Sequence, residues 1–296
     1  MIGKLFTFSS KNRNGVGFEY DGRQYDLNTT LWHCGSDLGI DIPEKLSMLE
    51  MITLVNKNPE ILDTLLNTIT EQHLEAACVL PETWKFEMPL QPPKIVAVGW
   101  NYAAHAKEGG YEVPESPVLF AKMTSSMIAH KETIRIPEGV GRVDYEIELG
   151  VIISDKVSGV SADEAQNYIA GYTIFNDVTA RDLQRQHKTT GRPWTVAKGY
   201  DTFGPCGPYV IPACMLPDPH NLELILTLNG EVKQHGYTRD MVFTIYELIA
   251  YISSIFTLFP GDIIATGTPE GISPLKSGDV IVAEIQPIGK LENPVQ

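Results

Sequence analysis

Strand-forming segments that follow one another with few helices between them constrain the fold of this 296-residue chain most. After residue 90, β-branched or alternating apolar runs bounded by Gly, Pro, Asn or Asp predict strands at residues 95–98, 118–122, 145–153, 172–175, 222–228, 263–265 and 280–285. Helical patterns are fewer and cover residues 162–169, after a Ser161/Glu164 capping box, and residues 244–256. Since helices of crossover length separate few of these strands, we expect an α+β, mainly β architecture and not a doubly wound parallel sheet.

The first 90 residues have a different pattern. Short strands are predicted at residues 5–8, 16–20 and 23–26, and helical spacing follows at residues 43–56 and 59–69, the second with Asn58 as its N-cap. The segment MPLQPP, residues 88–93, then interrupts regular structure. We therefore expect a smaller N-terminal α/β accessory domain, residues 1–90, and a larger domain of residues 91–296.

The net charge of −14 excludes the usual nucleic-acid and anionic-membrane binders, because both classes need a positive surface. The N-terminus has no signal-peptide pattern, and no apolar run is long enough to span a membrane. Cys34, Cys78, Cys206 and Cys214 form no CxxC pair, which is typical of a reducing compartment. We expect a cytoplasmic protein.

A row of carboxylates is the first candidate site. Strand alternation places Asp144, Glu146 and Glu148 on one face, and Asp177 follows a later apolar strand. Taken alone, the row is more typical of a solvent-facing strand edge, and Asp177 of a cap or turn. Alternatively, adjacent carboxylates that repel one another are stabilised by a hard cation. Three carboxylates without nearby His or Cys favour Mg²⁺ or Mn²⁺ over Zn²⁺.

His105 and Glu108 are three residues apart in a short Ala-rich helical stretch, which puts imidazole and carboxylate on one face. A carboxylate partner fixes the tautomer of a histidine and raises its basicity, as a general base requires. The alternative is a solvated helix surface. Gly109 and Gly110 follow directly and are typical of a hinge beside an active site.

Further polar residues are candidates for binding an anion. Arg181 and Gln184 point in one direction if a helical turn follows Asp177, and Lys122 and Lys198 each end an apolar segment. Thr268 lies in a Gly-Thr-Pro turn whose hydroxyl and amides suit a carboxylate. Each also has the simpler interpretation of an exposed side chain or an ordinary turn.

Together and in this order, these segments resemble the fumarylacetoacetate hydrolase superfamily over roughly residues 93–293. The resemblance depends on six motifs, VGWNYAAHAKE (98–108), SPVLFAKM (116–123), VDYEIELGVII (143–153), AGYTIFNDVTARDLQ (170–184), PWTVAKGYDTFGP (193–205) and FPGDIIATGTPEGI (259–272). One departure is Trp100, where smaller residues are commoner in the family.

The resemblance implies a mixed β-roll catalytic domain, a variable N-terminal region and a homodimer. It also assigns site residues, which are the metal ligands Glu146, Glu148 and Asp177, the cation Lys198 near the metal, the catalytic pair His105 and Glu108, and the substrate-binding Lys122, Arg181, Gln184 and Thr268.

The activity that we predict from this resemblance is Mg²⁺- or Mn²⁺-dependent hydrolysis of a C–C bond in a small 2-oxo acid of acylpyruvate or fumarylpyruvate type. Two alternatives use the same site, because one scaffold hosts several chemistries. They are decarboxylation or keto–enol tautomerisation of oxaloacetate, and isomerisation or decarboxylation of aromatic-catabolism intermediates. A catalytically inactive binding protein is the alternative from another class.

Overall fold

The computed structural model describes the whole chain except residues 1–3, 12, 21, 35–44, 72–79 and 81–82. Within this described part, eleven strands form one large sheet. They are β1 (Lys4–Ser9), β2 (Asn14–Tyr20), β3 (Arg23–Asp26), β4 (Lys85–Phe86), β5 (Ile95–Gly99), β6 (Val118–Lys122), β7 (Met127–Ile128), β9 (Ile147–Ile153), β10 (Ile169–Asn176), β12 (Gly204–Pro212) and β15 (Ile263–Ala265). The order is β3-β2-β1-β12-β10-β9-β15-β5-β6, with β4 beside β1 and β7 beside β12. The β5/β15 and β7/β12 pairs are parallel, and the other neighbours are antiparallel.

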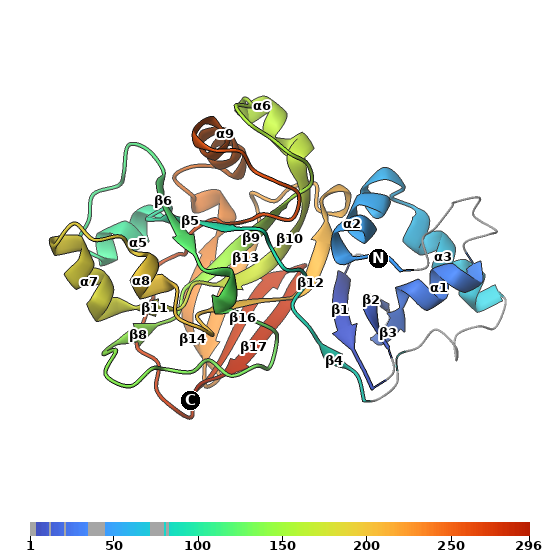
Figure 1. Cartoon of the computed structure of the whole chain (residues 1–296), viewed down its shortest axis with the longest axis horizontal. Coiled ribbons are helices and arrows are strands. Elements are labelled where there is room, and N and C mark those ends of the chain that lie inside the picture. Colours follow the sequence, from blue (N-terminus) through green and yellow to red (C-terminus); the bar gives the residue numbers. More distant parts are fainter. Residues whose placement is uncertain (1–3, 12, 21, 35–44, 72–79, 81–82) are drawn as a thin grey trace.

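A second sheet packs against the first, in the order β14-β13-β16-β17, and a short ladder joins β8 to β11. These strands are β8 (Val143–Asp144), β11 (Thr179–Ala180), β13 (Glu223–Leu228), β14 (Glu231–Tyr237), β16 (Val280–Gln286) and β17 (Gly289–Pro294). The helices are α1 (Leu27–Cys34), α2 (Met48–Lys57), α3 (Ile61–Glu71), α5 (Ala103–Glu108), α6 (Ala162–Ala165), α7 (Arg181–Thr189), α8 (Thr195–Lys198) and α9 (Ile245–Ile255). Figure 1 shows α1, α2 and α3 beside the N-terminal strands, and α5, α7 and α8 together at the opposite end of the molecule.

The central strands β9 and β10 are buried along their whole length. Leu149 and Val151 of β9 belong to the core that the second sheet covers, whereas Ile152 belongs to the core that α2 covers. Both faces of the large sheet are therefore packed, and each buried aliphatic side chain contributes about 1.5–3 kcal/mol. This packing gives the polar residues at the ends of β9 and β10 a rigid support.

The mainly stranded architecture predicted from the sequence is confirmed. The predicted strands do not include β12 and β17, nor the short strands β4, β7 and β11. The sequence of β12, GPCGPYVIP, is rich in Pro and Gly and has no alternating pattern, so only its pairing with β1 and β10 identifies it as a strand. The predicted helix 162–169 is also shorter: α6 ends at Ala165, a 3₁₀ turn covers Gln166–Tyr168, and Ile169 already begins β10.

The predicted role of Asn58 is wrong. Its side-chain amide donates to the Leu54 carbonyl at 3.0 Å, and its backbone amide donates to Leu54 and Val55, so Asn58 ends α2 and does not cap α3. The predicted start of the first helix, at residue 43, lies outside the described residues. The predicted capping box at Ser161 and Glu164 is present.

The N-terminal strands share the large sheet with the rest of the chain, because β1 pairs with β12. The boundary at residue 90 stays a prediction. Of the cysteines, Cys206 and Cys214 carry free thiols, and Cys78 lies outside the described residues. No helix in the described ranges combines the length and apolar character needed to span a membrane.

Candidate active site

Three carboxylates meet at one end of the β9–β10 ladder. Glu148 lies in β9, Glu146 precedes this strand, and Asp177 follows β10. Antiparallel pairing sets Phe175 opposite Glu148, and the Asp177 amide donates to the Glu146 carbonyl at 2.8 Å. One oxygen of each carboxylate lies within 4.8 Å of the others, and all three side chains are buried. The face that carries the alternating carboxylates thus points inward, so the solvent-facing edge typical of this pattern does not occur here.

Two buried lysines contact this acidic cluster. The Lys198 Nζ donates to Glu146 Oε2 at 2.7 Å and to Asp177 Oδ2 at 2.5 Å. The Lys122 Nζ donates to Asp177 Oδ1 at 2.6 Å and to the Lys198 carbonyl at 2.5 Å. Burial alone lowers the pKa of Lys198, but Asp177 and Glu146 outweigh it, and the pKa is raised overall. Lys198 therefore stays charged although its side chain is buried.

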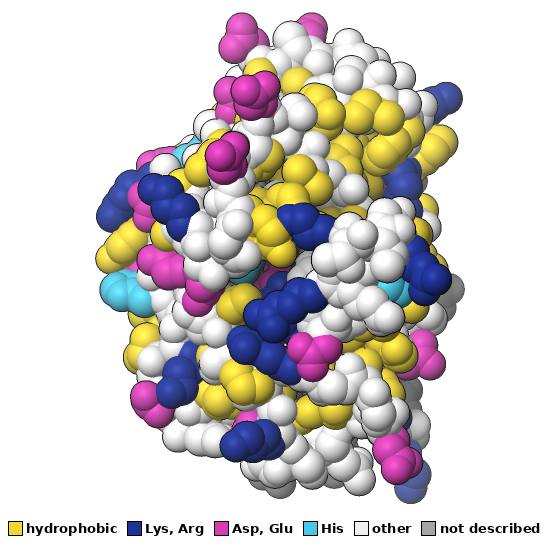
Figure 2. All heavy atoms as spheres, turned by 90° about the vertical axis from the view of Figure 1, so that its left-hand side faces the viewer, with side chains coloured by type: hydrophobic (Ala, Val, Ile, Leu, Met, Phe, Trp, Pro, Cys, Tyr) yellow, Lys and Arg dark blue, Asp and Glu magenta, His cyan; other side chains and the backbone are white. Residues whose placement is uncertain are grey.

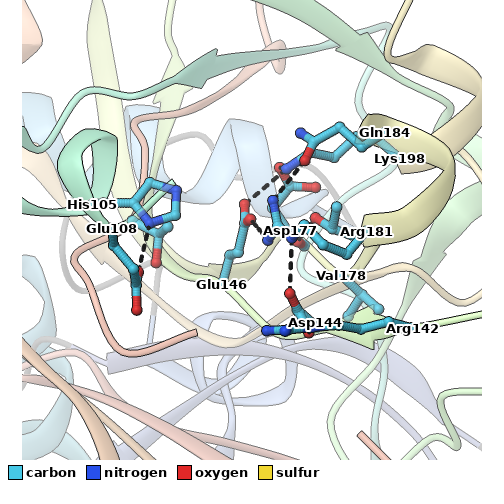
Figure 3. A network of polar contacts seen from close by, with 12 residues as sticks. His105, Glu108, Arg142, Asp144, Glu146, Asp177, Val178, Arg181, Gln184 and Lys198 are labelled. Atoms are coloured by element: carbon cyan, nitrogen blue, oxygen red, sulfur yellow. Dashed lines mark hydrogen bonds and ion pairs between the residues drawn. The ribbon is translucent and has the colours of Figure 1, made fainter. Parts of the chain in front are cut away.

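Arg181, at the start of α7, connects the three-carboxylate cluster to a fourth buried carboxylate, that of Asp144. Its Nε donates to Asp144 Oδ2 at 2.8 Å, and its terminal nitrogens donate to Gln184 Oε1 at 2.6 Å and to Glu146 Oε1 (Figure 3). Burial raises the pKa of Glu146, but Lys198 and Arg181 exceed this effect and hold the pKa well below its usual value. Glu146 is consequently ionised across the physiological pH range.

Glu148 has a different environment. Its Oε2 accepts a hydrogen bond from the Gly267 amide at 3.0 Å, and no cationic side chain within the described part of the chain forms an ion pair with it. Burial raises the pKa of Glu148, and the nearby charges of Asp177 and Glu146 raise it further. Among the three carboxylates, Glu148 is therefore the one whose negative charge is not balanced by the protein.

His105 and Glu108 form a pair on α5. The His105 Nδ1 lies 3.3 Å from Glu108 Oε2, and the Gly271 amide donates to Glu108 Oε1 at 3.1 Å. Burial raises the pKa of Glu108, but these two hydrogen bonds outweigh burial, and the pKa is lowered. Figure 3 shows the His105 ring on the side of Glu108 that faces Glu146. The predicted pair is formed, with a charged carboxylate that orients the imidazole.

A small pocket of ≈ 20 Å³ lies between α5 and the acidic cluster. Its lining includes seven of the residues predicted from the sequence, which are His105, Glu146, Glu148, Arg181, Gln184, Lys198 and Thr268. Three other predicted residues lie behind this lining: Glu108 contacts His105, and Asp177 and Lys122 lie beneath Lys198. Val98, Gly99, Trp100 and Trp194 complete the lining.

Two supporting residues were not predicted. The Gln234 side chain accepts from the Ile147 amide at 3.0 Å and donates to Thr268 Oγ1 at 2.8 Å, which fixes the turn beside the cluster. Asn101 is fully buried and connects the start of α5 to the Thr266 carbonyl at 2.8 Å. Asn101 lies within the motif VGWNYAAHAKE (98–108), which was a signal for its importance. The segment around Gln234 has no pattern that predicts burial.

Basic side chains gather at the end of the molecule where α7 lies (Figure 1 and Figure 2). Figure 2 faces the end where α7 lies in Figure 1, and Lys and Arg side chains gather near its middle. Arg185, Lys188 and Arg192 are exposed on α7 and the turn after it. In a chain with a net charge of −14, such a local concentration attracts anions toward the pocket.

Comparisons with known proteins cover the part of the chain that forms this site. The family model described as fumarylacetoacetate (FAA) hydrolase C-terminal matches residues 94–296. The chain is 49% identical over 206 residues to oxaloacetate tautomerase FAHD1, mitochondrial, of Arabidopsis thaliana. The aligned region covers 70% of this chain and 92% of that protein.

Two solved structures extend the comparison. Fumarylacetoacetate hydrolase from psychrophilic Exiguobacterium antarcticum covers 99% of both chains, with 30% identity and a TM-score of 0.80. Fumarylpyruvate hydrolase from Pseudomonas aeruginosa, in complex with Mn²⁺ and pyruvate, covers 71% of this chain and 91% of that chain, with 31% identity and a TM-score of 0.67. The fold prediction is thereby confirmed, and the chain belongs to the fumarylacetoacetate hydrolase superfamily.

Proposed function

We propose that this protein is a Mg²⁺- or Mn²⁺-dependent enzyme that hydrolyses a C–C bond in a short acylpyruvate- or fumarylpyruvate-type 2-oxo acid. The observation that carries the proposal is the position of the buried acidic cluster and the His105–Glu108 pair on two sides of one pocket. The similar fumarylpyruvate hydrolase, whose structure contains Mn²⁺ and pyruvate, supports the same substrate class.

The donor set fits a hard divalent cation. Glu146, Glu148 and Asp177 offer only oxygen atoms, which Mg²⁺ and Mn²⁺ prefer, and Glu148 has no ion-pair partner among the described residues, so a bound cation would stabilise its charged form. When bound, such an ion would hold the carboxylate and keto oxygens of a 2-oxo acid and polarise the keto group.

The protein's own residues then have separate tasks. His105, oriented by Glu108, takes a proton from the water that adds to the distal carbonyl carbon. The C–C bond next to that carbon breaks, the distal part leaves as a carboxylic acid, and the electron pair passes to the pyruvate part, which is then protonated. The Lys198 ammonium group offsets negative charge that develops on the pyruvate oxygen.

The remaining polar residues orient the substrate. We assign Arg181, Gln184 and Thr268 to its carboxylate and distal oxygens, because all three line the pocket. Lys122 acts indirectly by holding Asp177 and the Lys198 carbonyl in place. The N-terminal accessory role, the homodimer and the cytoplasmic location stay predictions.

Keto–enol tautomerisation of oxaloacetate is the second candidate. It is favoured by the 49% identity to a protein named oxaloacetate tautomerase, of which this chain covers 92%. The same His105–Glu108 pair would move a proton between carbon and oxygen.

One assay tests the proposal. The purified protein is treated with EDTA, and consumption of acetylpyruvate and of enol-oxaloacetate is followed by absorbance before and after addition of Mg²⁺ or Mn²⁺. We expect turnover that depends on the added ion and disappears in Glu148→Gln. No turnover of any 2-oxo acid, with either ion, would favour the inactive binding protein.

A further inference from the structure

Two aromatic side chains, Trp100 and Trp194, line the pocket, and a third, Tyr111, packs against Trp100; we refer to these three side chains as the aromatic wall. The rings of Trp100 and Trp194 are 4.7 Å apart at 85°, and those of Trp100 and Tyr111 are 4.6 Å apart. Both tryptophans line the same pocket as His105 and Glu146. The wall therefore lies where the part of a substrate distal to the acidic cluster must extend.

The backbone is fitted to this arrangement. Trp100 has φ 56°, a left-handed conformation that side chains with a Cβ rarely adopt. At Gly99, a Cβ would lie 2.7 Å from the Trp194 ring, so only glycine leaves space for that ring. Phe120 supports Trp194 from the other side, with ring centroids 5.5 Å apart. Trp194 is thus packed close to Gly99, Trp100 and Phe120.

Lys188 of α7 holds the third member of the wall. Its Nζ lies 3.0 Å from the centroid of the Tyr111 ring and 4.7 Å from that of Trp100. Such cation–π contacts contribute about 0.5–2 kcal/mol, so the loop after α5 is fastened to α7. The wall is therefore a connected structure and not a set of separate side chains.

The space inside the wall is small. The pocket of ≈ 20 Å³ holds about one or two water-sized spheres, whereas pockets for larger ligands occupy about 300–1,000 Å³. Trp194 does not belong to α5 or to the loop after it, so opening of α5 would make room on the side of His105 while Trp194 stays in the lining. A bulky distal group would meet Trp100 or Trp194.

We propose that the aromatic wall determines substrate size: the site accepts 2-oxo acids with a short group beyond the keto carbon, of oxaloacetate or acetylpyruvate size, and rejects aromatic ones. This inference rests on the proposed function, since it takes the acidic cluster as the place where the 2-oxo acid end binds. Trp100 and Trp194 are the specificity-determining residues, and the selection is steric.

Binding measurements test this directly. Titration calorimetry in the presence of Mg²⁺ compares oxalate, which is short, with phenylpyruvate, whose ring replaces the short group. The variants are Trp100→Gly, chosen because glycine tolerates the positive φ, and Trp194→Ala. The matched control is Trp32→Ala, on α1, because that side chain is 76% exposed and far from the pocket lining.

We expect the wild type to prefer oxalate, and each wall variant to gain about tenfold or more in phenylpyruvate affinity relative to oxalate. Trp32→Ala should keep the wild-type ratio. Equal binding of both ligands by the wild type, or an unchanged ratio in a folded wall variant, would overturn the role of the wall while leaving the proposed function intact. If oxalate does not bind to the wild type with Mg²⁺ or Mn²⁺, the proposed function fails first, and the wall inference fails with it.

Discussion

Glu148 is the residue whose environment indicates most directly that a cation binds in this site. It is fully buried beside Glu146 and Asp177, and of these three carboxylates it has no cationic partner among the described residues. Burial and the two neighbouring charges raise its pKa, so without a bound cation it retains its proton. Ligation of a cation requires the loss of that proton, and metal affinity should therefore rise with pH.

The raised pKa also affects folding stability. A carboxyl group whose folded-state pKa exceeds its unfolded value of about 4.5 makes the metal-free protein less stable as pH rises through that interval. Glu148→Gln removes this effect. We expect the metal-free variant to gain stability relative to the wild type, and to gain more at pH 8 than at pH 5. Urea unfolding in EDTA at both pH values measures the difference.

Two further variants make that result specific. Glu146→Gln should lose stability, on the order of 3 kcal/mol, because Lys198 and Arg181 each lose one of their two buried carboxylate partners. Glu60→Gln changes an exposed carboxylate and should stay within about 0.5 kcal/mol of the wild type. A metal-free Glu148→Gln protein that is less stable than the wild type at pH 8 would show that the carboxylate is stabilised by the fold.

His105 separates the reactions that share this site. Hydrolysis and tautomerisation both need a group that moves a proton, whereas decarboxylation of oxaloacetate needs none at this position. His105→Ala should therefore reduce acylpyruvate hydrolysis by about 10²- to 10⁴-fold, with a clearly smaller loss in decarboxylation. Steady-state rates at equal Mn²⁺ saturation, corrected for the reaction of the free ion, provide the comparison. Lys107→Ala, exposed on the same helix, is the control. Unchanged hydrolysis in His105→Ala would place the base elsewhere.

At the scale of elements, α5 is a short helix attached at its two ends, and the loop after it contacts α7 through Tyr111 and Lys188. Its six residues are held at the start by the buried Asn101 and at the end by the Glu108 contact with Gly271. Gly110, with φ 76°, lies directly after the helix and permits a change in chain direction. This arrangement is typical of a segment that closes over a bound ligand.

Hydrogen exchange measures that closure. We expect amides in residues 101–115 to exchange more slowly when oxalate and Mg²⁺ are present, because a ligand that contacts His105 favours the closed arrangement. The helix α9, which packs in the core away from the pocket, should show no change. Equal protection of residues 101–115 with and without ligand would exclude a lid in this segment.

Some elements could be predicted from local patterns and others could not. The alternation around Glu146 and Glu148 predicted their shared face, because a strand has a fixed period of two. It did not predict that this face is buried, since burial depends on the second sheet and on α7. Lys122 was predicted to line the pocket, but its contact with Asp177 turns it beneath Lys198. A side chain's partner across 55 residues leaves no local pattern.

Over the whole molecule, the N-terminal region shares a hydrophobic core with the rest of the chain. Leu5, Phe18 and Ile52 share a cluster of buried side chains with Phe175 and Val210, which belong to β10 and β12. The break at residues 88–93 was visible in the sequence because its three prolines interrupt regular structure. The pairing of β1 with β12 was not visible, because about 200 residues separate the two strands and pairing over that distance depends on tertiary packing.

This continuity predicts the effect of truncation. A chain of residues 91–296 would expose the apolar face that the first 90 residues cover, and each aliphatic side chain returned to water costs about 1.5–3 kcal/mol. We expect it to unfold at a lower temperature than the full chain and to self-associate. Calorimetry and size-exclusion chromatography test both points. A monodisperse truncated protein with the same Tm would support an independent domain boundary at residue 90.

The central claim is that Glu146, Glu148 and Asp177 bind a divalent cation. Titration of EDTA-stripped protein with Mn²⁺, followed by the loss of the free-ion electron paramagnetic resonance signal, tests it without any substrate. We predict a single tight site per chain in the wild type, and a loss of at least about 10-fold in affinity in Glu148→Gln, with Glu60→Gln unchanged. Equal Mn²⁺ binding by the wild type and Glu148→Gln, or no binding by the wild type, would contradict the claim.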